Sequence, residues 1–241
     1  MTYNELTTVD FGYQKLLQLL QDGEKFDFSR YGDGEFSCID NRRNRPMNSD
    51  FHRYFPSLAE ALLKVLKESN LKDSMNYFIG LQTLAYRQKS EFISNLAKEY
   101  DIRFFKSNFI HTVNMKRGLQ EYWDVLNTRK VIVVGASHLR AVNKYFKYDK
   151  FIEVPLQDAW LAKDKIAEQI EPFTHDEDNV ISYSCGMMKC VLIDQFKGLC
   201  TQLDNGSIFD PWCGMNTRSY HFEMDAGKGN QPSEYFKLKG K

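Results

Sequence analysis

The sequence lacks net charge, long apolar runs and paired cysteine motifs, and each absence excludes a class of protein. Its 32 Lys and Arg residues balance 32 Asp and Glu residues. This argues against a protein that works through bulk charge, such as a histone-like DNA coat or a polybasic membrane binder. No apolar run approaches the ~20 residues that a membrane-spanning helix needs. The N-terminal segment has no basic region followed by an uninterrupted apolar stretch, so we expect no secretory signal.

Cysteine, proline and glycine are few or scattered. The five cysteines form no C-x-x-C pair, so we expect no structural zinc site but a reduced, cytoplasmic protein with buried thiols. Six Pro and 14 Gly residues exclude a collagen-like or linker-like chain. A hydrophobic fraction of 42% over 241 residues is enough for one domain. We expect that domain to cover residues 1–241, with a core over roughly residues 25–215 and a loop-rich C-terminal tail. The oligomeric state is left open.

Short apolar runs alternate with amphipathic stretches along most of the chain. Residues 130–135 form the clearest run, β-branched and continuous, as expected for a strand buried on both faces. Further strands are expected over residues 25–31, 76–81, 102–105, 151–155 and 179–183, and helices around 16–20 and over 58–66, 89–100, 117–126, 160–170 and 187–196. This alternation predicts a single Rossmann-like α/β domain with a mainly parallel sheet flanked by helices.

Ligands of such sheets bind at the carboxyl ends of the strands, so the residues that follow each strand are the candidates for a site. After the first strand comes Arg30-Tyr31-Gly32-Asp33-Gly34-Glu35, which we expect to be irregular. Asp33 and Glu35 are the carboxylates that Mg²⁺ or Mn²⁺ would take together with substrate phosphates. Arg30 is suited to a bidentate phosphate contact. The alternative is an acidic surface turn.

Two other strand ends carry groups that suit an anion. The turn at 135–140 presents backbone N–H groups with Ser137, His138 and Arg140, although an ordinary turn is the alternative. The chain has no G-x-G-x-x-G, Walker A or G-x-S-x-G motif, so a Ser137–His138 nucleophile pair is not expected. Lys189 follows Gly186 at the start of a helix, where its ammonium would face an anionic ligand. A surface lysine is the alternative there.

Two further segments are less specific. Residues 203–212 hold Asp204 and Asp210 in a stretch rich in turn-forming residues, which also fits a loop closing the sheet. Residues 42–54 combine Arg42, Arg43 and Arg45 with His52, Arg53 and Tyr54. That mixture suits a phosphate backbone or a stacked base. A mobile basic surface loop is the simpler interpretation, and we favour it for this segment. We expect His111 to be a core residue.

In this order, the segments resemble those of the GT-D-type glycosyltransferases, first known as a bacterial domain of unknown function. Residues 30–35 resemble the family signature with its Asp-x-Glu metal motif, and residues 134–146 resemble its strand, glycine turn and Ser/Arg pair. Residues 154–160 are similar to its Pro-x-x-Asn-Ala-aromatic segment. Residues 186–195 are similar to its Gly-x-x-Ala-Lys-Val-Leu helix opening, and 204–210 to its Asp-Ile-Gly-His-x-Asp segment.

The resemblance implies transfer of a sugar from a nucleotide-sugar, usually a UDP-sugar, to an acceptor hydroxyl with Mn²⁺ or Mg²⁺. Glu35 and Asp33 would hold the metal against the diphosphate, while Lys189 and Arg140 would contact phosphate. The residues expected to bind the donor are Arg30, Gly32, Gly34, Ser137, His138, Arg140, Gly186, Lys189 and Ser207.

The chain also departs from the family pattern. Ser207 stands where the family has histidine, and Met188 stands where it has alanine. The acceptor base is therefore open, with Asp210 and Asp204 as candidates. The acceptor is open as well. The candidate acceptors are a hydroxymethylated base in viral DNA and a protein-linked or cell-surface glycan. The alternative function is a module that binds nucleotide-sugar without turnover.

Overall fold

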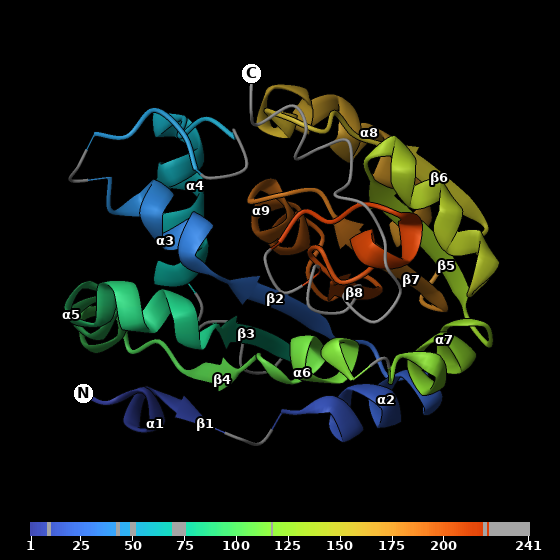
Figure 1. The fold of residues 1–241 in the computed structure, drawn as a ribbon, viewed down its shortest axis with the longest axis horizontal. Coiled ribbons are helices and arrows are strands. Elements are labelled where there is room, and N and C mark those ends of the chain that lie inside the picture. The colour runs from blue at the N-terminus through green and yellow to red at the C-terminus, as the bar shows by residue number, and fades with distance from the viewer. Residues whose placement is uncertain are drawn as a thin grey trace.

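The protein is built on one eight-stranded sheet in which every recorded strand pair is parallel, as the sequence predicts. The computed structural model describes residues 1–8, 11–41, 44–48, 52–68, 76–116, 118–218 and 221. Figure 1 shows the sheet running through the molecule, in the order β1-β4-β3-β2-β8-β7-β5-β6. The strands are β1 (Thr7–Thr8), β2 (Asp27–Tyr31), β3 (Tyr77–Leu81), β4 (Phe104–Lys106), β5 (Lys130–Gly135), β6 (Lys150–Glu153), β7 (Asn179–Ser184) and β8 (Thr201–Asp204).

Helices connect the strands and cover the sheet. The α-helices are α1 (Tyr3–Leu6), α2 (Tyr13–Gln21), α3 (Asp33–Ile39), α4 (Pro56–Lys67), α5 (Thr83–Tyr100), α6 (Phe109–Met115), α7 (Gln120–Leu126), α8 (Lys163–Thr174) and α9 (Met188–Gln195). Short 3-10 helices are η2 (Ser137–Lys144), η3 (Ala159–Ala162) and η4 (Asp210–Cys213). Across the described ranges, no helix has both the length and the apolar character needed to cross a membrane.

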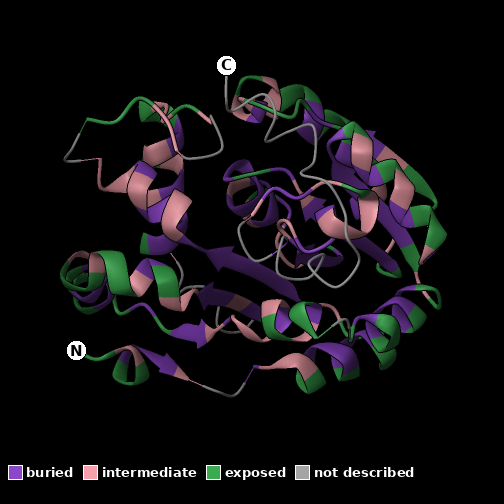
Figure 2. Ribbon diagram, in the orientation of Figure 1, coloured by how far each residue is buried: buried purple, intermediate pink, exposed green. Residues whose placement is uncertain are grey.

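The sheet separates two hydrophobic cores. In β5, Ile132 and Val134 pack into one core, whereas Val131 and Val133 pack into the other. Residues of α3, α4, α5, α8 and α9 complete the first core, and residues of α2, α6, α7 and η2 complete the second. Figure 2 shows the strands buried and the outer helix faces exposed. Burial on both faces explains why this strand is apolar throughout rather than alternating.

The segment after β2 is helical, so the prediction of irregular structure at residues 32–35 is wrong. Gly32 is extended and serves as the N-cap of α3, which begins at Asp33. The Glu35 side chain accepts a hydrogen bond from the Gly32 N–H at 2.9 Å. Acidic residues in a first turn favour helix formation because the helix dipole is positive at that end. The two carboxylates were noted for metal binding, but they are also a helix start signal.

Two other elements differ from expectation. The helix predicted at 89–100 begins at Thr83, and its backbone is non-helical at Lys89, where φ is −140° and ψ is 36°. Lys89 Nζ donates to the Asp40 side chain at 2.9 Å, which ties the kink of α5 to the end of α3. The strand β8 was not predicted, and its last two residues fell in the turn-rich stretch 203–212. It lies fully buried between β2 and β7, because its polar residues have partners inside the fold.

The strand order places a topological switch point at the middle of the sheet. From β2 the chain moves outward to β3 and β4, whereas from β5 it moves outward in the opposite direction to β6. Strands β7 and β8 then fill the centre beside β2. In open α/β sheets the crevice at such a point is where ligands bind. The carboxyl ends of β2, β8 and β7 are therefore where a site is expected.

Candidate functional site

Four charged side chains meet at the switch point. Arg30 comes from the end of β2, Asp204 from the end of β8, Lys189 from the first turn of α9 and Glu35 from the first turn of α3. The Arg30 backbone N–H donates to Asp204 Oδ2 at 2.8 Å, and its Nη2 donates to Oδ1 at 3.2 Å. One arginine thus pairs with Asp204 through backbone and side chain together. These residues are called the buried cluster below.

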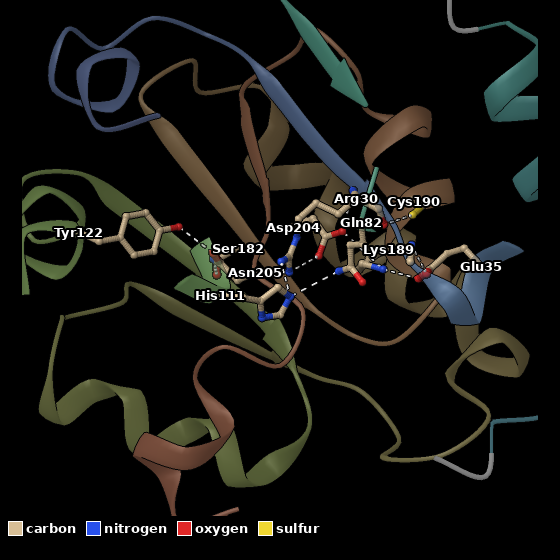
Figure 3. Close-up of polar contacts among 11 residues, drawn as sticks. Arg30, Glu35, Gln82, His111, Tyr122, Ser182, Lys189, Cys190, Asp204 and Asn205 are labelled. Atoms are coloured by element: carbon tan, nitrogen blue, oxygen red, sulfur yellow. Dashed lines mark hydrogen bonds and ion pairs between the residues drawn. The ribbon is translucent and has the colours of Figure 1, made fainter. Parts of the chain in front are cut away.

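Lys189 joins the two carboxylates of the buried cluster. Its Nζ donates to Glu35 Oε1 at 2.5 Å and lies 3.4 Å from Asp204 Oδ2 (Figure 3). The Lys189 and Glu35 side chains are only 7% and 8% exposed, and that of Asp204 is 0% exposed. The two cations and two anions sum to zero charge. Such compensation is required, because an unpaired charge at this depth would be strongly destabilising.

The pKa values follow from this pairing. Burial raises the pKa of Glu35, but the Lys189 ammonium and the hydrogen bonds outweigh burial and leave it below the ordinary value. Burial lowers the pKa of Lys189, but the negative charges of Asp204 and Glu35 outweigh it, so this pKa is raised. Both groups are therefore charged at neutral pH.

The carboxylates of α3 differ in how well they fit a metal. Both oxygens of Glu35 are engaged, one by Lys189 and one by the Gly32 N–H. Asp33, the first residue of α3, is half-buried. Within the described part of the chain, no three His, Cys, Asp or Glu side chains gather as a metal site would require. Mg²⁺ needs only one or two carboxylates when substrate phosphates supply other ligands. Asp33, which is half-buried at the start of α3, is a candidate for that role, and Glu35 would first have to release Lys189.

Arg30 also contacts a histidine that the sequence did not single out for function. Its Nη1 lies 3.3 Å from His111 Nε2, which lies 3.4 Å from Gln82 Nε2 (Figure 3). Both neighbours are donors, so Nε2 accepts and the ring proton belongs on Nδ1. Burial and the Arg30 charge lower the pKa of His111 to about 3. His111 is thus a neutral acceptor, and no local pattern in the sequence points to its contact with Arg30.

The turn after β8 closes over Arg30. The Tyr122 hydroxyl donates to Asn205 Oδ1 at 2.8 Å, and Asn205 Nδ2 donates to Ser182 Oγ at 2.8 Å. Gly206 follows with φ of +54°, and a Cβ there would overlap Arg30 Nη2. Glycine is needed at this position both for its backbone angle and for the close approach.

The predicted glycines lie around the same crevice. A Cβ on Gly32 would be 2.6 Å from Gln82 Oε1, so a larger residue would require this side chain to move. Gly186 has φ of +67° and precedes α9, which carries Lys189. Gly34 lies within α3, where an added Cβ would meet only ordinary contacts at 3.7 Å.

A second polar group lies near β5. His138 Nε2 is 3.0 Å from Asp210 Oδ1, and the Thr217 hydroxyl donates to Asp210 Oδ2. The two candidate acceptor bases therefore occupy different surroundings. Asp204 belongs to the buried cluster, whereas Asp210 belongs to this group.

Three predicted donor contacts lie further out. Ser137 is exposed at the start of η2, and Ser207 is partly exposed in the turn after β8. Arg140 is exposed and donates to Glu153 Oε2 at 2.9 Å through Nη2. Its guanidinium also lies 4.4 Å from the centre of the Phe151 ring. Arg140 is thereby directed to β6 at the edge of the sheet, and its phosphate contact stays a prediction.

The basic segment at 42–54 is only partly visible. Arg42 and Arg43 lie outside the described residues, and Arg45 is exposed. Arg53 is not a free basic group, because its Nε donates to Asp158 Oδ2 at 2.6 Å and its backbone N–H to Oδ1 at 2.9 Å. This contact joins the segment to the loop that follows β6.

A small pocket lies where these segments meet the start of α9. Aromatic and basic side chains line it together with Asp158, Cys185 and two methionines. The lining includes His52, Arg53, Phe55 and Trp160. Trp160 is held by a hydrogen bond from its Nε1 to Ser57 Oγ at 3.0 Å. The pocket opens beside the helix that carries Lys189.

No protein-family model matches this sequence, and no curated protein matches it either. Similar solved structures exist. One is described as the domain of unknown function 1792 with a distinct glycosyltransferase fold. It has a TM-score of 0.62 at 16% identity, covering 97% of this chain and 94% of that chain. The fold is that of the DUF1792 domains.

Two other structures of this fold agree. A new glycosyltransferase (DUF1792) from Streptococcus sanguinis has a TM-score of 0.63 at 15% identity, covering 86% of this chain and 83% of that chain. A selenomethionine-substituted DUF1792 structure has a TM-score of 0.63 at 16% identity, covering 97% and 94%. Identities this low show a common fold. The roles of Asp33, Glu35 and the other candidate residues remain predictions.

Proposed function

We propose that this protein is a glycosyltransferase that moves a sugar from a nucleotide-sugar to an acceptor hydroxyl. The observation that carries the proposal is the buried cluster at the switch point of a sheet that has the DUF1792 fold. Solved structures with that fold are described as glycosyltransferases, and this position is where α/β sheets bind ligands. Fold alone does not define an activity, so the charged residues at this point are essential to the proposal.

The donor in this proposal is a UDP-sugar, bound with Mn²⁺ or Mg²⁺. Asp33 would hold the ion together with diphosphate oxygens. When bound, such an ion offsets the charge that develops on the leaving diphosphate. Lys189 holds Glu35 in place at the start of α3, which orients Asp33 two residues earlier. Arg30 fixes Asp204 and the turn after β8, and so shapes the floor of the crevice.

For the acceptor we propose a hydroxymethylated nucleic-acid base, of the kind expected in viral DNA. The pocket supports this choice, because Phe55 and Trp160 give it aromatic rings and His52 adds an imidazole, whereas Arg53 is already paired with Asp158. A base within a duplex would have to be flipped out or met as a single strand. Binding of a hydroxymethylated single-stranded oligonucleotide should weaken as salt rises. If the protein transfers sugar to a glycan and not to such a base, the proposed acceptor is wrong, but the proposed glycosyltransferase activity stands.

The donor proposal is tested by thermal shift with a panel of nucleotide-sugars, each with and without Mn²⁺. One donor should stand out, because ligand at 100 times its Kd adds about 2.7 kcal/mol to the free energy of unfolding. Asp33→Asn should abolish the Mn²⁺-dependent part of that shift. The control is Asp178→Asn, since Asp178 is exposed just before β7, at the opposite end of the sheet. A panel without any shift or turnover would disprove the proposal. Binding without turnover would indicate a non-catalytic module.

A further inference from the structure

The group formed by His138, Asp210 and Thr217 has no part in holding the donor as proposed above. His138 Nε2 lies 3.0 Å from Asp210 Oδ1, and the Thr217 hydroxyl donates to the other oxygen of the same carboxylate. A carboxylate only accepts hydrogen bonds, so Nε2 must carry the ring hydrogen. In the neutral ring the lone pair is then on Nδ1. This is the arrangement of a histidine prepared to accept a proton.

The group lies on the same edge of the sheet as the buried cluster. His138 is three residues beyond Gly135, where β5 ends, and Asp210 is six residues beyond Asp204, where β8 ends. The connecting turn is compact, because the Asp210 N–H donates to the Ser207 carbonyl at 3.2 Å. The His138 side chain is 16% exposed, so it is not sealed in the core. Asp210 is its polar partner among the residues that the structure describes.

The carboxylates that the sequence suggested as acceptor base are already engaged. Asp204 is fully buried, and Arg30 donates to both of its oxygens. Asp210 accepts from His138 and Thr217, one on each oxygen. Ser207 has no basic nitrogen. Among Asp204, Asp210, Ser207 and His138, the basic atom that the recorded contacts leave available to a substrate is therefore His138 Nδ1.

We propose that His138 is the general base for the acceptor hydroxyl and that Asp210 positions it. This inference rests on the glycosyl transfer proposed above. The acceptor oxygen forms a bond to the anomeric carbon of the sugar while its proton passes to His138 Nδ1. The bond from that carbon to the diphosphate oxygen breaks, and its electron pair leaves with the nucleoside diphosphate. The Asp210 carboxylate stabilises the imidazolium that forms, and the Thr217 hydroxyl holds that carboxylate in place.

The test measures release of UDP from UDP-glucose, UDP-galactose and UDP-N-acetylglucosamine with Mn²⁺, with water as acceptor. His138→Asn should lower kcat by about 10²–10⁴, the usual contribution of a general base. The KM for the donor and the thermal shift with UDP should stay unchanged. Imidazole added to His138→Ala should restore part of kcat. His175→Asn is the matched control, because His175 is exposed beyond the end of α8.

Asp210→Asn gives an independent readout. Its amide N–H would donate to His138 Nε2, so the ring proton would move to Nδ1 and block proton uptake. We expect kcat to fall while KM and the UDP shift are retained, which a merely structural role would not produce. A kcat of His138→Asn within threefold of wild type would overturn the proposal. So would a loss confined to KM or to UDP binding. If wild-type protein releases UDP from no donor, the proposed function fails first, and this inference fails with it.

Discussion

At the scale of single residues, Lys189 links the two carboxylates of the buried cluster. Its ammonium lies between Glu35 and Asp204, which come from α3 and β8. The sequence indicated that this lysine faces an anionic ligand, and in the structure its ammonium contacts two carboxylates. The anions are side chains of the protein itself. The prediction of a phosphate contact therefore stays untested, while the stabilising role of Lys189 follows directly from its burial.

Removal of Lys189 should destabilise the fold strongly. Lys189→Met would leave the Glu35 carboxylate buried without its cation, which costs about 3–5 kcal/mol of unfolding free energy. Urea unfolding measures this loss. Lys64→Met is the control, because Lys64 is 73% exposed and 4.0 Å from Glu68, a surface pair that contributes about 1 kcal/mol or less.

A second substitution separates charge from shape. In the Lys189→Met background, Glu35→Gln removes the uncompensated carboxylate and should recover part of the lost stability. Equal losses for Lys189→Met and Lys64→Met would show that the buried cluster contributes no more than a surface pair. A further loss of stability when Glu35→Gln is added to Lys189→Met would also contradict the prediction that the unpaired carboxylate is what destabilises the protein.

At the scale of elements, propensity and patterning predicted most strands and helices but missed those held by distant contacts. The run at 130–135 became β5 with the same bounds, because β-branched residues buried on both faces need no further signal. By contrast, β8 contains Gln202 and Asp204, which suggest a loop. Gln202 donates to Asp27 at 2.6 Å, and Asp204 accepts from Arg30. Partners 174 and 175 residues away make this polar strand stable in the interior.

The pairing of β3 with its neighbours depends on a glycine. Gly80 pairs with Arg30 of β2 and Phe105 of β4, and an added Cβ would overlap Ser107 Cβ and lie 3.2 Å from Arg30 Cγ. Gly80→Ala should therefore lower the free energy of unfolding by about 1–3 kcal/mol, the usual cost of overpacking.

Thermal or urea unfolding of three proteins tests this expectation. Ser107→Gly added to Gly80→Ala should restore stability, because it removes the overlapping atom. Gly118→Ala is the control, since its Cβ would come no closer than 3.4 Å to Val113. A Gly80→Ala protein as stable as Gly118→Ala would mean that β3 and β4 shift apart without cost.

At the scale of the whole molecule, the two ends of the sheet differ in their charge. The carboxyl end carries the neutral buried cluster, whereas Asp27 lies buried at the amino end. Asp27 accepts from the Gly198 N–H at 2.8 Å and from Gln202 Nε2 at 2.6 Å. Burial outweighs these hydrogen bonds and raises the pKa of Asp27 to about 7. Unlike Glu35, which has Lys189, Asp27 forms no recorded ion pair among the described residues, and the charge of the partly exposed Lys197 is too weak to offset burial.

Global stability should therefore fall as the pH rises toward 7. The folded protein keeps a proton on Asp27 that the unfolded chain, with its ordinary pKa near 4, releases earlier. The stabilising effect of that proton is complete below pH 4 and is lost as the pH rises through about 7. The slope from this residue is at most about 1.4 kcal/mol per pH unit.

The contribution of Asp27 is isolated by measuring the free energy of unfolding of wild type and Asp27→Asn between pH 4.5 and 8. The asparagine cannot titrate, so its curve should lack the decline, although one hydrogen bond is lost at every pH. The difference between the curves is the quantity compared, because other groups titrate equally in both proteins. Parallel curves would show that Asp27 is ionised throughout this range.

The sequence by itself determined the fold class and the edge of the sheet that carries the site. Apolar runs and amphipathic helices are local patterns, and parallel strands bring their carboxyl ends together, so 32–35, 135–140 and 184–189 could be placed on one edge. Only the tertiary structure decided which charges neutralise one another. Lys189 and Glu35 are 154 residues apart, and His138 and Asp210 are 72 apart. No local pattern encodes such pairs, because their energies arise only when packing removes both partners from water.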